Sequence, residues 1–153
     1  MSDAVAVRRA AAGDVAAWHA LRIALWPDAD ETLDELRAQL QRDDAATWLA
    51  FDADDRAIAF AEAGLRRDYV NGTETSPVGF LEGLYVVEAW RRSGVGRALV
   101  AAVEEWTRGQ GCSELASDAL IDNLQSHAAH AAYGFEETER VVYFRKLLPG
   151  APR

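Results

Sequence analysis

Two kinds of hydrophobic spacing alternate along this chain and predict a mixed α/β fold. Segments with apolar residues every three or four positions, the period of a helix with one buried face, are 15–25, 31–42, 95–108 and 123–132. Shorter apolar runs, typical of strands, are 4–8, 47–51, 57–65, 80–87, 114–117 and 140–146. The order β-α-α-β-β-β-α-β-α-β predicts one central mixed β-sheet flanked by helices.

Residues that favour turns and caps separate these segments. Asp14 is a typical N-cap before the first helix, and Pro27 predicts where that helix ends. The acidic segment 52–55 predicts a hairpin between antiparallel strands. Asn71-Gly72 predicts a turn within a loop over 67–77.

The length and composition predict a single domain over residues 1–153. The chain has 153 residues, half of them hydrophobic, which suits one compact core. It has no long apolar segment and no basic-then-apolar N-terminal layout, so we expect a cytoplasmic protein without a membrane partner. Cys112 is the only cysteine, which excludes an internal disulfide and leaves too few ligands for a cysteine-based zinc site. We expect a buried thiol there and no metal.

The net charge of −9 bears on the class of partner. Nucleic-acid binding relies on basic patches that neutralise phosphates, so the acidic balance argues against it. A cationic small molecule suits this charge better, although acidic proteins are often acidic only for solubility. The positions of the carboxylates must decide between these two interpretations.

The sequence Arg91-Arg92-Ser93-Gly94-Val95-Gly96 lies between the predicted strand 80–87 and the predicted helix 95–108. Glycines let backbone N–H groups turn toward an anion, and the start of a helix adds unpaired donors. This arrangement predicts a pyrophosphate site, whereas a tight turn with solvated arginines is the alternative. Leu99 stands where a dinucleotide-binding loop has its third glycine, and Arg97-Ala98 follows Gly96 where a Walker loop has Lys-Ser or Lys-Thr.

The pattern Arg/Gln-x-x-Gly-x-Gly/Ala after a strand resembles the acetyl-CoA loop of the GCN5-related N-acetyltransferases, the GNAT family. The element order, Arg8-Arg9-Ala10 with Asp14, and Tyr133-Gly134-Phe135 are similar to that family as well. The resemblance implies a single-domain acetyltransferase fold with acetyl-CoA as co-substrate. It assigns cofactor binding to Leu84, Tyr85, Val86, Arg92, Ser93, Gly94, Val95, Gly96, Arg97 and Asn123.

A narrower resemblance points to the aminoglycoside 6'-N-acetyltransferases. Its segments are Leu25-Trp26-Pro27, Asp68-Tyr69-Val70-Asn71-Gly72, Ser76-Pro77, Phe80-Leu81-Glu82-Gly83, Ala116-Ser117-Asp118 and 134–140. The resemblance assigns the aminoglycoside site to Trp26, Tyr69, Glu82, Asp118 and Glu139. Carboxylates and aromatic faces are what a sugar with several ammonium groups needs.

Each of these residues also has an ordinary structural interpretation. Trp26 can serve as packing at a helix end, Tyr69 as an exposed loop residue and Asp118 as a cap. Glu139 belongs to an acidic run that is typical of a solvated face. Glu82 differs, because a glutamate within an apolar central strand is costly to bury without a partner or a function.

The implied reaction is direct acetyl transfer to the 6'-amine within a ternary complex, which would confer antibiotic resistance. Glu82 is the candidate base, acting through a water, or else it binds a substrate ammonium. The backbone N–H of Leu84 or Val86 is the candidate oxyanion donor. His130 stands where many family members have a tyrosine acid; it is either a proton donor or a packed helix residue.

Other functions and proton donors remain open at this point. Tyr133 and Tyr143 are further candidate donors. The alternatives are an acetyltransferase for another polyamine or amino sugar, and a non-catalytic binder of cationic ligands. The resemblance also implies a homodimer.

Overall fold

The computed structural model describes residues 4–150 and 152, which form two compact units. The first unit extends to Asp118 and holds the sheet with three of the helices. The second unit begins at Ala119 and holds one helix followed by the C-terminal segment.

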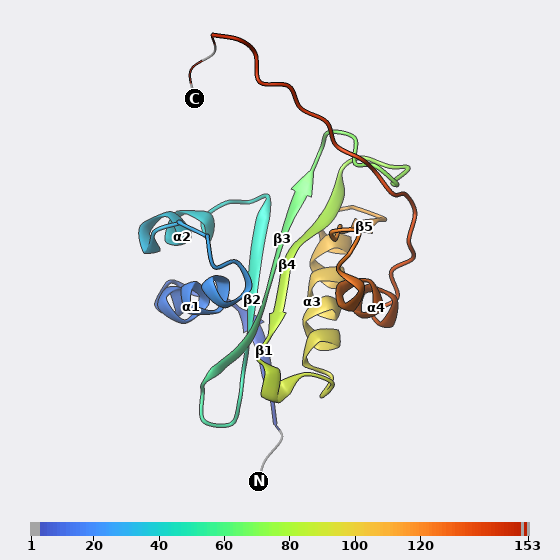
Figure 1. The fold of residues 1–153 in the computed structure, drawn as a ribbon. Coiled ribbons are helices and arrows are strands. Elements are labelled where there is room, and N and C mark those ends of the chain that lie inside the picture. Colours follow the sequence, from blue (N-terminus) through green and yellow to red (C-terminus); the bar gives the residue numbers. More distant parts are fainter. Residues whose placement is uncertain (1–3, 151, 153) are drawn as a thin grey trace. The chain divides into compact units, whose positions relative to one another are not determined.

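The sheet of the first unit has its strands in chain order, as Figure 1 shows. Strands β1 to β4 pair antiparallel, and β5 pairs parallel to β4. Their bounds are β1 Ala6–Arg9, β2 Ala45–Phe51, β3 Ala57–Arg66, β4 Val78–Val86 and β5 Leu115–Ala116. The predicted antiparallel hairpin around 52–55 and the predicted loop over 67–77 are therefore confirmed.

Helices cover both faces of this sheet. Helix α1 (Val15–Leu25) and helix α2 (Leu33–Gln39) lie on one face, and helix α3 (Val95–Gly109) lies on the other (Figure 1). On the first face Trp18 and Leu36 pack with Phe60 of β3, and all three are fully buried. On the second face α3 buries an apolar stripe made by Leu99, Val100, Val103 and their neighbours. Two short 3-10 helices, η1 (Ala12–Asp14) and η2 (Glu88–Trp90), lie in the connections.

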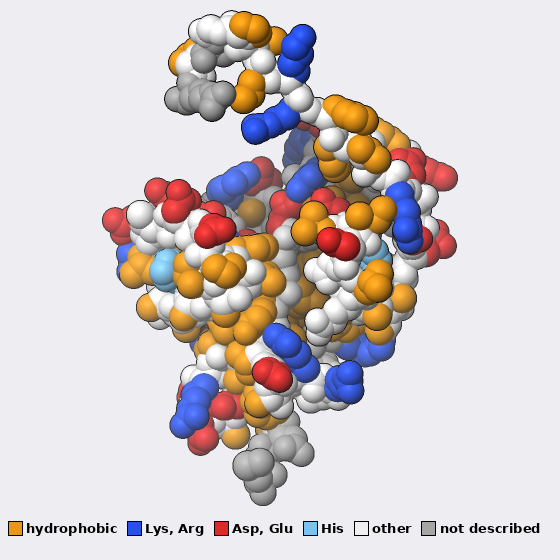
Figure 2. Space-filling view, in the orientation of Figure 1, with side chains coloured by type: hydrophobic (Ala, Val, Ile, Leu, Met, Phe, Trp, Pro, Cys, Tyr) orange, Lys and Arg blue, Asp and Glu red, His pale blue; other side chains and the backbone are white. Residues whose placement is uncertain are grey.

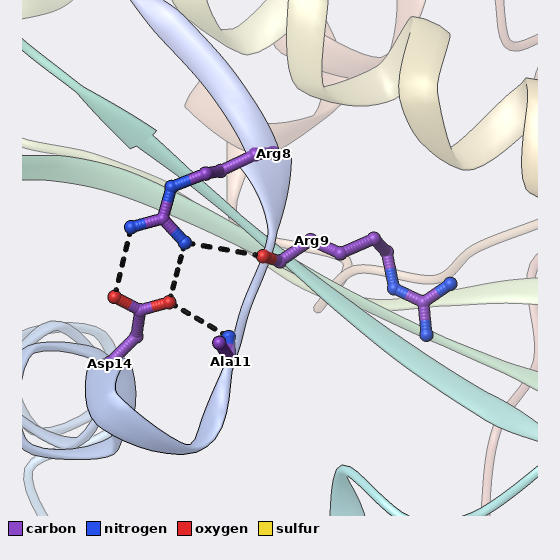
Figure 3. Close-up of polar contacts among 4 residues, drawn as sticks. All are labelled: Arg8, Arg9, Ala11 and Asp14. Atoms are coloured by element: carbon purple, nitrogen blue, oxygen red, sulfur yellow. Dashed lines mark hydrogen bonds and ion pairs between the residues drawn. The ribbon is translucent and has the colours of Figure 1, made fainter.

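The start of α1 differs from the expectation that the Asp14 side chain caps it. The Asp14 carboxylate instead accepts hydrogen bonds from both guanidinium nitrogens of Arg8, at 2.7 and 3.1 Å, and from the N–H of Ala11 at 2.8 Å (Figure 3). The hydrogen bond from Arg8 holds the pKa of Asp14 below its usual value. Asp14 therefore ties the end of β1 to the turn before α1.

The pairing between β4 and β5 is short. It joins Gly79 to Leu115 and Phe80 to Ala116. Beyond Phe80 no β5 residue pairs with β4, while β3 continues along its other side as far as Val86. Among the described residues, β4 from Leu81 to Val86 thus has one edge without a strand partner.

The second unit contains helix α4 (Leu124–Ala132), which confirms the predicted helix. The predicted last strand over 140–146 is wrong, because this segment has no regular secondary structure in the described chain. Its alternating apolar residues favour an extended backbone, but a strand forms only where a neighbour supplies hydrogen bonds. Val142, Tyr143 and Phe144 are 74%, 82% and 91% exposed, and hydrophobic side chains are uncovered along this segment in Figure 2.

Candidate functional site

The unpaired edge of β4 exposes particular backbone groups. The N–H of Val87 donates to the carbonyl of Ile58 on β3 at 2.9 Å, whereas the carbonyl of Val86 points the other way and accepts from Arg91 Nε at 2.8 Å. Backbone direction alternates along a strand, so the N–H groups of Val86 and Leu84 face the open edge. The predicted oxyanion donors are therefore directed to the side of β4 that has no partner strand.

The glycine loop connects β4 through η2 to the start of α3. Gly94 has a φ of 91°, a left-handed conformation that favours glycine, and it occupies the N-cap position of α3. It has no side chain to accept from the first N–H groups of the helix, and the first turn of α3 carries no acidic residue. Arg92, with a φ of 62°, is also left-handed, and its side chain is exposed. Uncapped helix donors beside arginines suit a pyrophosphate, so the loop fits the group that the sequence predicted.

Glu82 lies in a β-bulge of β4. Leu81 pairs with Ala63 and Gly83 pairs with Glu62, so Glu82 is an extra residue without a partner on β3. The Glu82 side chain is 36% exposed, so the cost of burying a glutamate within an apolar strand does not arise here. Glu82 follows Phe80 by two positions and shares its face of the sheet, the α1 face, and the bulge brings Gly83 to that face as well. Nη2 of Arg66 lies 2.5 and 3.1 Å from the two carboxylate oxygens of Glu82.

Trp26, at the C-terminal end of α1, packs directly against the residue that follows Glu82. A Cβ on Gly83 would lie 2.4 Å from Cη2 of Trp26, so only glycine lets the indole approach β4 this closely. The ring also meets Phe60 edge-on, with 6.0 Å between the centroids. Two of the predicted substrate residues, Trp26 and Glu82, are thus brought to the same face of the sheet.

A buried ion pair, which the sequence pattern did not predict, lies against Trp26. The guanidinium of Arg22 bonds Glu62 of β3, lies 2.9 Å from Glu31, and lies 4.9 Å from the centre of the Trp26 ring. Trp18 Nε1 donates to the same Glu62 oxygen at 2.8 Å. Glu62, rather than Glu82, is therefore the glutamate that the sheet buries. The signal available in the sequence was that Arg22 follows Trp18 by four positions and shares its buried helix face.

A cavity of about 270 Å³ lies beside this ion pair. Polar side chains from α1, α2, the α2–β2 connection and the sheet line it: Arg22, Gln39, Arg42, Asp44, Glu62, Arg66 and Glu82. The sequence pattern did not single out Arg66. It lies two positions after Gly64 and four positions after Glu62, so it shares their face of β3.

Tyr69 and Asp118 occupy exposed positions in the first unit. Tyr69 lies in the loop after β3 and is 70% exposed. Just after the end of β5, Ser117 Oγ donates to the carbonyl of Leu81 at 3.3 Å. The next residue, Asp118, is exposed and lies two positions after the end of β5.

Asn123, His130 and Glu139 belong to the second unit. Asn123 Oδ1 accepts from the N–H of Ser126 at 3.1 Å and caps α4. His130 Nδ1 lies 2.7 Å from the carbonyl of Ser126, and its ring meets Phe135 edge-on at 5.2 Å, which is the environment of a packed helix histidine. Glu139 is exposed in the segment after α4.

Comparison with known proteins decides the family. A sequence model of the acetyltransferase (GNAT) family matches residues 15–135. The chain belongs to the GNAT acetyltransferase family. Among relatives of this GNAT chain, an aminoglycoside N(6')-acetyltransferase type 1 from Stenotrophomonas maltophilia is 59% identical over 148 residues, which cover 97% of each chain.

Solved structures of GNAT enzymes have the same fold. The aminoglycoside 6'-N-acetyltransferase AAC(6')-Ih from Acinetobacter baumannii superposes with a TM-score of 0.90 at 45% identity, over 95% of this chain and 99% of that one. AAC(6')-Iy in complex with the bisubstrate analogue CoA-S-monomethyl-acetylneamine gives a TM-score of 0.90 at 42% identity, over 95% and 100%. The α/β fold expected from the sequence is thereby confirmed.

Two further features of the described residues concern other classes of site. No helix in 4–150 is long and apolar enough to cross a membrane. Within the described part of the chain, no group of three or more His, Cys, Asp or Glu side chains is placed to hold a metal ion.

Proposed function

We propose that this protein is an acetyl-CoA-dependent aminoglycoside 6'-N-acetyltransferase. It transfers an acetyl group to the 6'-amine of aminoglycoside antibiotics and so confers resistance. The observation that carries the proposal is the combination, in one GNAT chain, of an uncapped glycine loop with an indole and a carboxylate on one face of the bulged strand. The 59% identity to an aminoglycoside N(6')-acetyltransferase over nearly the whole chain supports it.

Acetyl-CoA supplies the activated acetyl group when it is bound. The backbone N–H groups from Ser93 to Arg97 and the side chain of Arg92 would hold its pyrophosphate, while the Ser93 hydroxyl donates to the carbonyl of Trp90 within the loop. The backbone of 84–86 would hold the acetyl end, since the N–H groups of Leu84 and Val86 face the open edge of β4. A backbone N–H directed at the carbonyl oxygen stabilises the negative charge that develops there.

The acceptor amine must be neutral when it attacks, although it carries a proton near neutral pH. Glu82 is proposed to bind the ammonium and to accept its proton through a water. Trp26 offers an aromatic face to the sugar ring beside it. Tyr69, Asp118 and Glu139 stay predicted substrate residues, His130 a predicted proton donor and Asn123 a predicted contact of the pantetheine arm.

We also propose that the two units work as one acetyltransferase domain and that the enzyme is a cytoplasmic homodimer. The GNAT match from 15 to 135 crosses the boundary between the units, which supports one domain. The dimer is supported by the exposed apolar side chains at 142–144, because exposed patches of this kind mark interfaces. Light scattering after gel filtration tests it: the mass of a dimer is expected for the wild type, and that of a monomer for Phe144→Asp.

The test of the activity is release of the coenzyme A thiol from acetyl-CoA, followed with a thiol reagent. Turnover is expected with kanamycin or tobramycin, and none with an analogue that carries a 6'-hydroxyl group. A flat response to every 6'-amino drug contradicts the proposal. Faster turnover of a simple polyamine such as spermidine would instead identify another amine as the substrate.

A further inference from the structure

We propose that Arg66 is a specificity-determining residue of the acceptor site. Its guanidinium holds the Glu82 carboxylate, and a substrate ammonium that binds between the two oxygens of Glu82 displaces it. The inference rests on the proposed function, and it concerns a residue that neither the sequence pattern nor the family resemblance pointed to.

The first argument is the geometry of the pair. A single nitrogen, Nη2 of Arg66, lies within hydrogen-bond distance of both Glu82 oxygens, at 2.5 and 3.1 Å. It therefore lies in the fork between the two oxygens, a position from which an incoming ammonium would also reach both of them. Arg66 and a substrate ammonium compete for one place.

Phe80 and the strand register fix Arg66 beside the Glu82 carboxylate. The centre of its guanidinium lies 3.6 Å from the centroid of the Phe80 ring, so the cation stacks on an aromatic face. Phe80 pairs with Gly64 on β3, two residues before Arg66, and Glu82 follows Phe80 by two positions on β4, so the side chains of Phe80, Glu82 and Arg66 lie on the same face of the sheet. The strand register alone thus brings Phe80, Glu82 and Arg66 together.

The Arg66–Glu82 ion pair can be broken by a competing cation. The Arg66 and Glu82 side chains are 45% and 36% exposed, and ion pairs in contact with solvent contribute little to stability. The pair also lines the cavity of about 270 Å³, which gives a displaced guanidinium room to move without disturbing the buried Arg22–Glu62 pair. Displacement exchanges one cation for another at Glu82.

The consequence concerns which amines the site accepts. After displacement Arg66 remains near Phe80 and leaves a positive charge beside the bound ammonium. An amine with other positive charges close to the one at Glu82 is repelled by Arg66, whereas one whose further charges lie away from it is not. Arg66 therefore weakens binding and selects among polyamine substrates by where their charges lie.

The test compares Arg66→Met with two matched variants. Methionine keeps an unbranched side chain against Phe80 and removes the charge. Arg66→Lys keeps the charge, and Arg67→Met makes the same change in net charge at the neighbouring exposed arginine. Kanamycin binding is measured by calorimetry, and kcat and KM are measured by thiol release.

For Arg66→Met, the dissociation constant and KM for kanamycin are expected to fall by about three- to fivefold, with kcat little changed, because one exposed ion pair is removed from competition. Arg66→Lys should lie near the wild type, and Arg67→Met should leave both constants unchanged. The effect should shrink as salt is added.

Weaker binding in Arg66→Met, or an equal gain in Arg67→Met, would overturn the inference. Should the methionine variant fail to fold, as judged by circular dichroism, Arg66→Gln gives the same comparison. Calorimetry measures binding without turnover. If the wild type binds kanamycin but releases no thiol, the proposed function is contradicted, and the binding constants of the variants still decide the role of Arg66.

Discussion

The close contact between Gly83 and Trp26 gives a quantitative prediction. In Gly83→Ala the new Cβ would lie 2.4 Å from Cη2 and 2.6 Å from Cζ2 of the indole, so the ring must retreat by about 1 Å to reach an ordinary contact of 3.4 Å. The ring has little room, because Phe60 meets it edge-on and the Arg22 guanidinium lies 4.9 Å from it. Overpacking of this kind lowers the free energy of unfolding by about 1–3 kcal/mol.

Catalysis should suffer more than stability does. Trp26 is proposed to place the sugar ring, and a misplacement of about 1 Å lowers kcat/KM for an aminoglycoside by about tenfold to a hundredfold. The measurements are urea unfolding followed by far-ultraviolet circular dichroism, and steady-state kinetics with kanamycin. The KM for acetyl-CoA should stay near the wild-type value, because the glycine loop is not touched.

Two other strand glycines provide matched controls. Gly79→Ala also overpacks the sheet, since its Cβ would lie 2.6 Å from Thr107 Cγ2 on the α3 face, but it leaves Trp26 in place. It should lower stability and leave kcat/KM for kanamycin nearly unchanged. Gly64→Ala meets only the Asp44 carbonyl, at 3.5 Å, and should do little. If Gly83→Ala resembles Gly79→Ala in its kinetics, the argument that Trp26 positions the sugar is refuted.

Three further predictions test the loop, the carboxylate and the Arg8–Asp14 pair. Glu82→Gln should lower kcat/KM for kanamycin by about tenfold, because one charged hydrogen bond to the substrate is lost, and the KM for acetyl-CoA should stay unchanged. An unaltered kcat/KM for kanamycin would remove Glu82 from the mechanism. Gly94 has a φ of 91°, so Gly94→Ala should lower the free energy of unfolding by about 1 kcal/mol and raise the KM for acetyl-CoA. An acetyl-CoA KM equal to that of the wild type would argue against the anion site. Arg8 holds the pKa of Asp14 below its usual value, so Asp14 stabilises the fold above about pH 4 and this contribution is lost as the pH falls further. Asp14→Asn should therefore be less stable than the wild type at pH 7 and lose less stability on acidification, as measured by the midpoints of urea unfolding at pH 7 and at acidic pH. Equal losses of stability on acidification in the two proteins would contradict the Arg8–Asp14 ion pair.

Much of the fold was readable from local patterns. The spacing of Val95, Leu99 and Val103 predicted α3, and the structure buries all three. The glycine loop was predicted because its requirements are local: a left-handed backbone at Gly94 and a helix start directly after it. Features that depend on a few consecutive residues can be read from those residues.

The details of the acceptor site were not readable in the same way. The sequence shows that a glutamate within an apolar strand is costly to bury, but it does not show that Glu82 is 36% exposed and paired with Arg66, or that a bulge brings Gly83 to the same face. The glutamate that is buried, Glu62, is matched by Arg22, forty positions earlier in the chain. A hydrophobic pattern gives the alternation along a strand but not the point where one extra residue interrupts it.

The C-terminal segment and the acceptor site show which features depend on neighbouring residues and which depend on contacts between distant ones. The amino-acid pattern alone determines the extended preference of 140–146, the left-handed glycine at the start of α3 and the acidic balance of the chain. The register between β3 and β4 determines that Trp26, Arg66 and Glu82 share one face, because these residues are far apart in sequence and meet only when the strands pair. A backbone preference acts over a few bonds, whereas an ion pair or a strand ladder needs a partner that only the folded chain supplies.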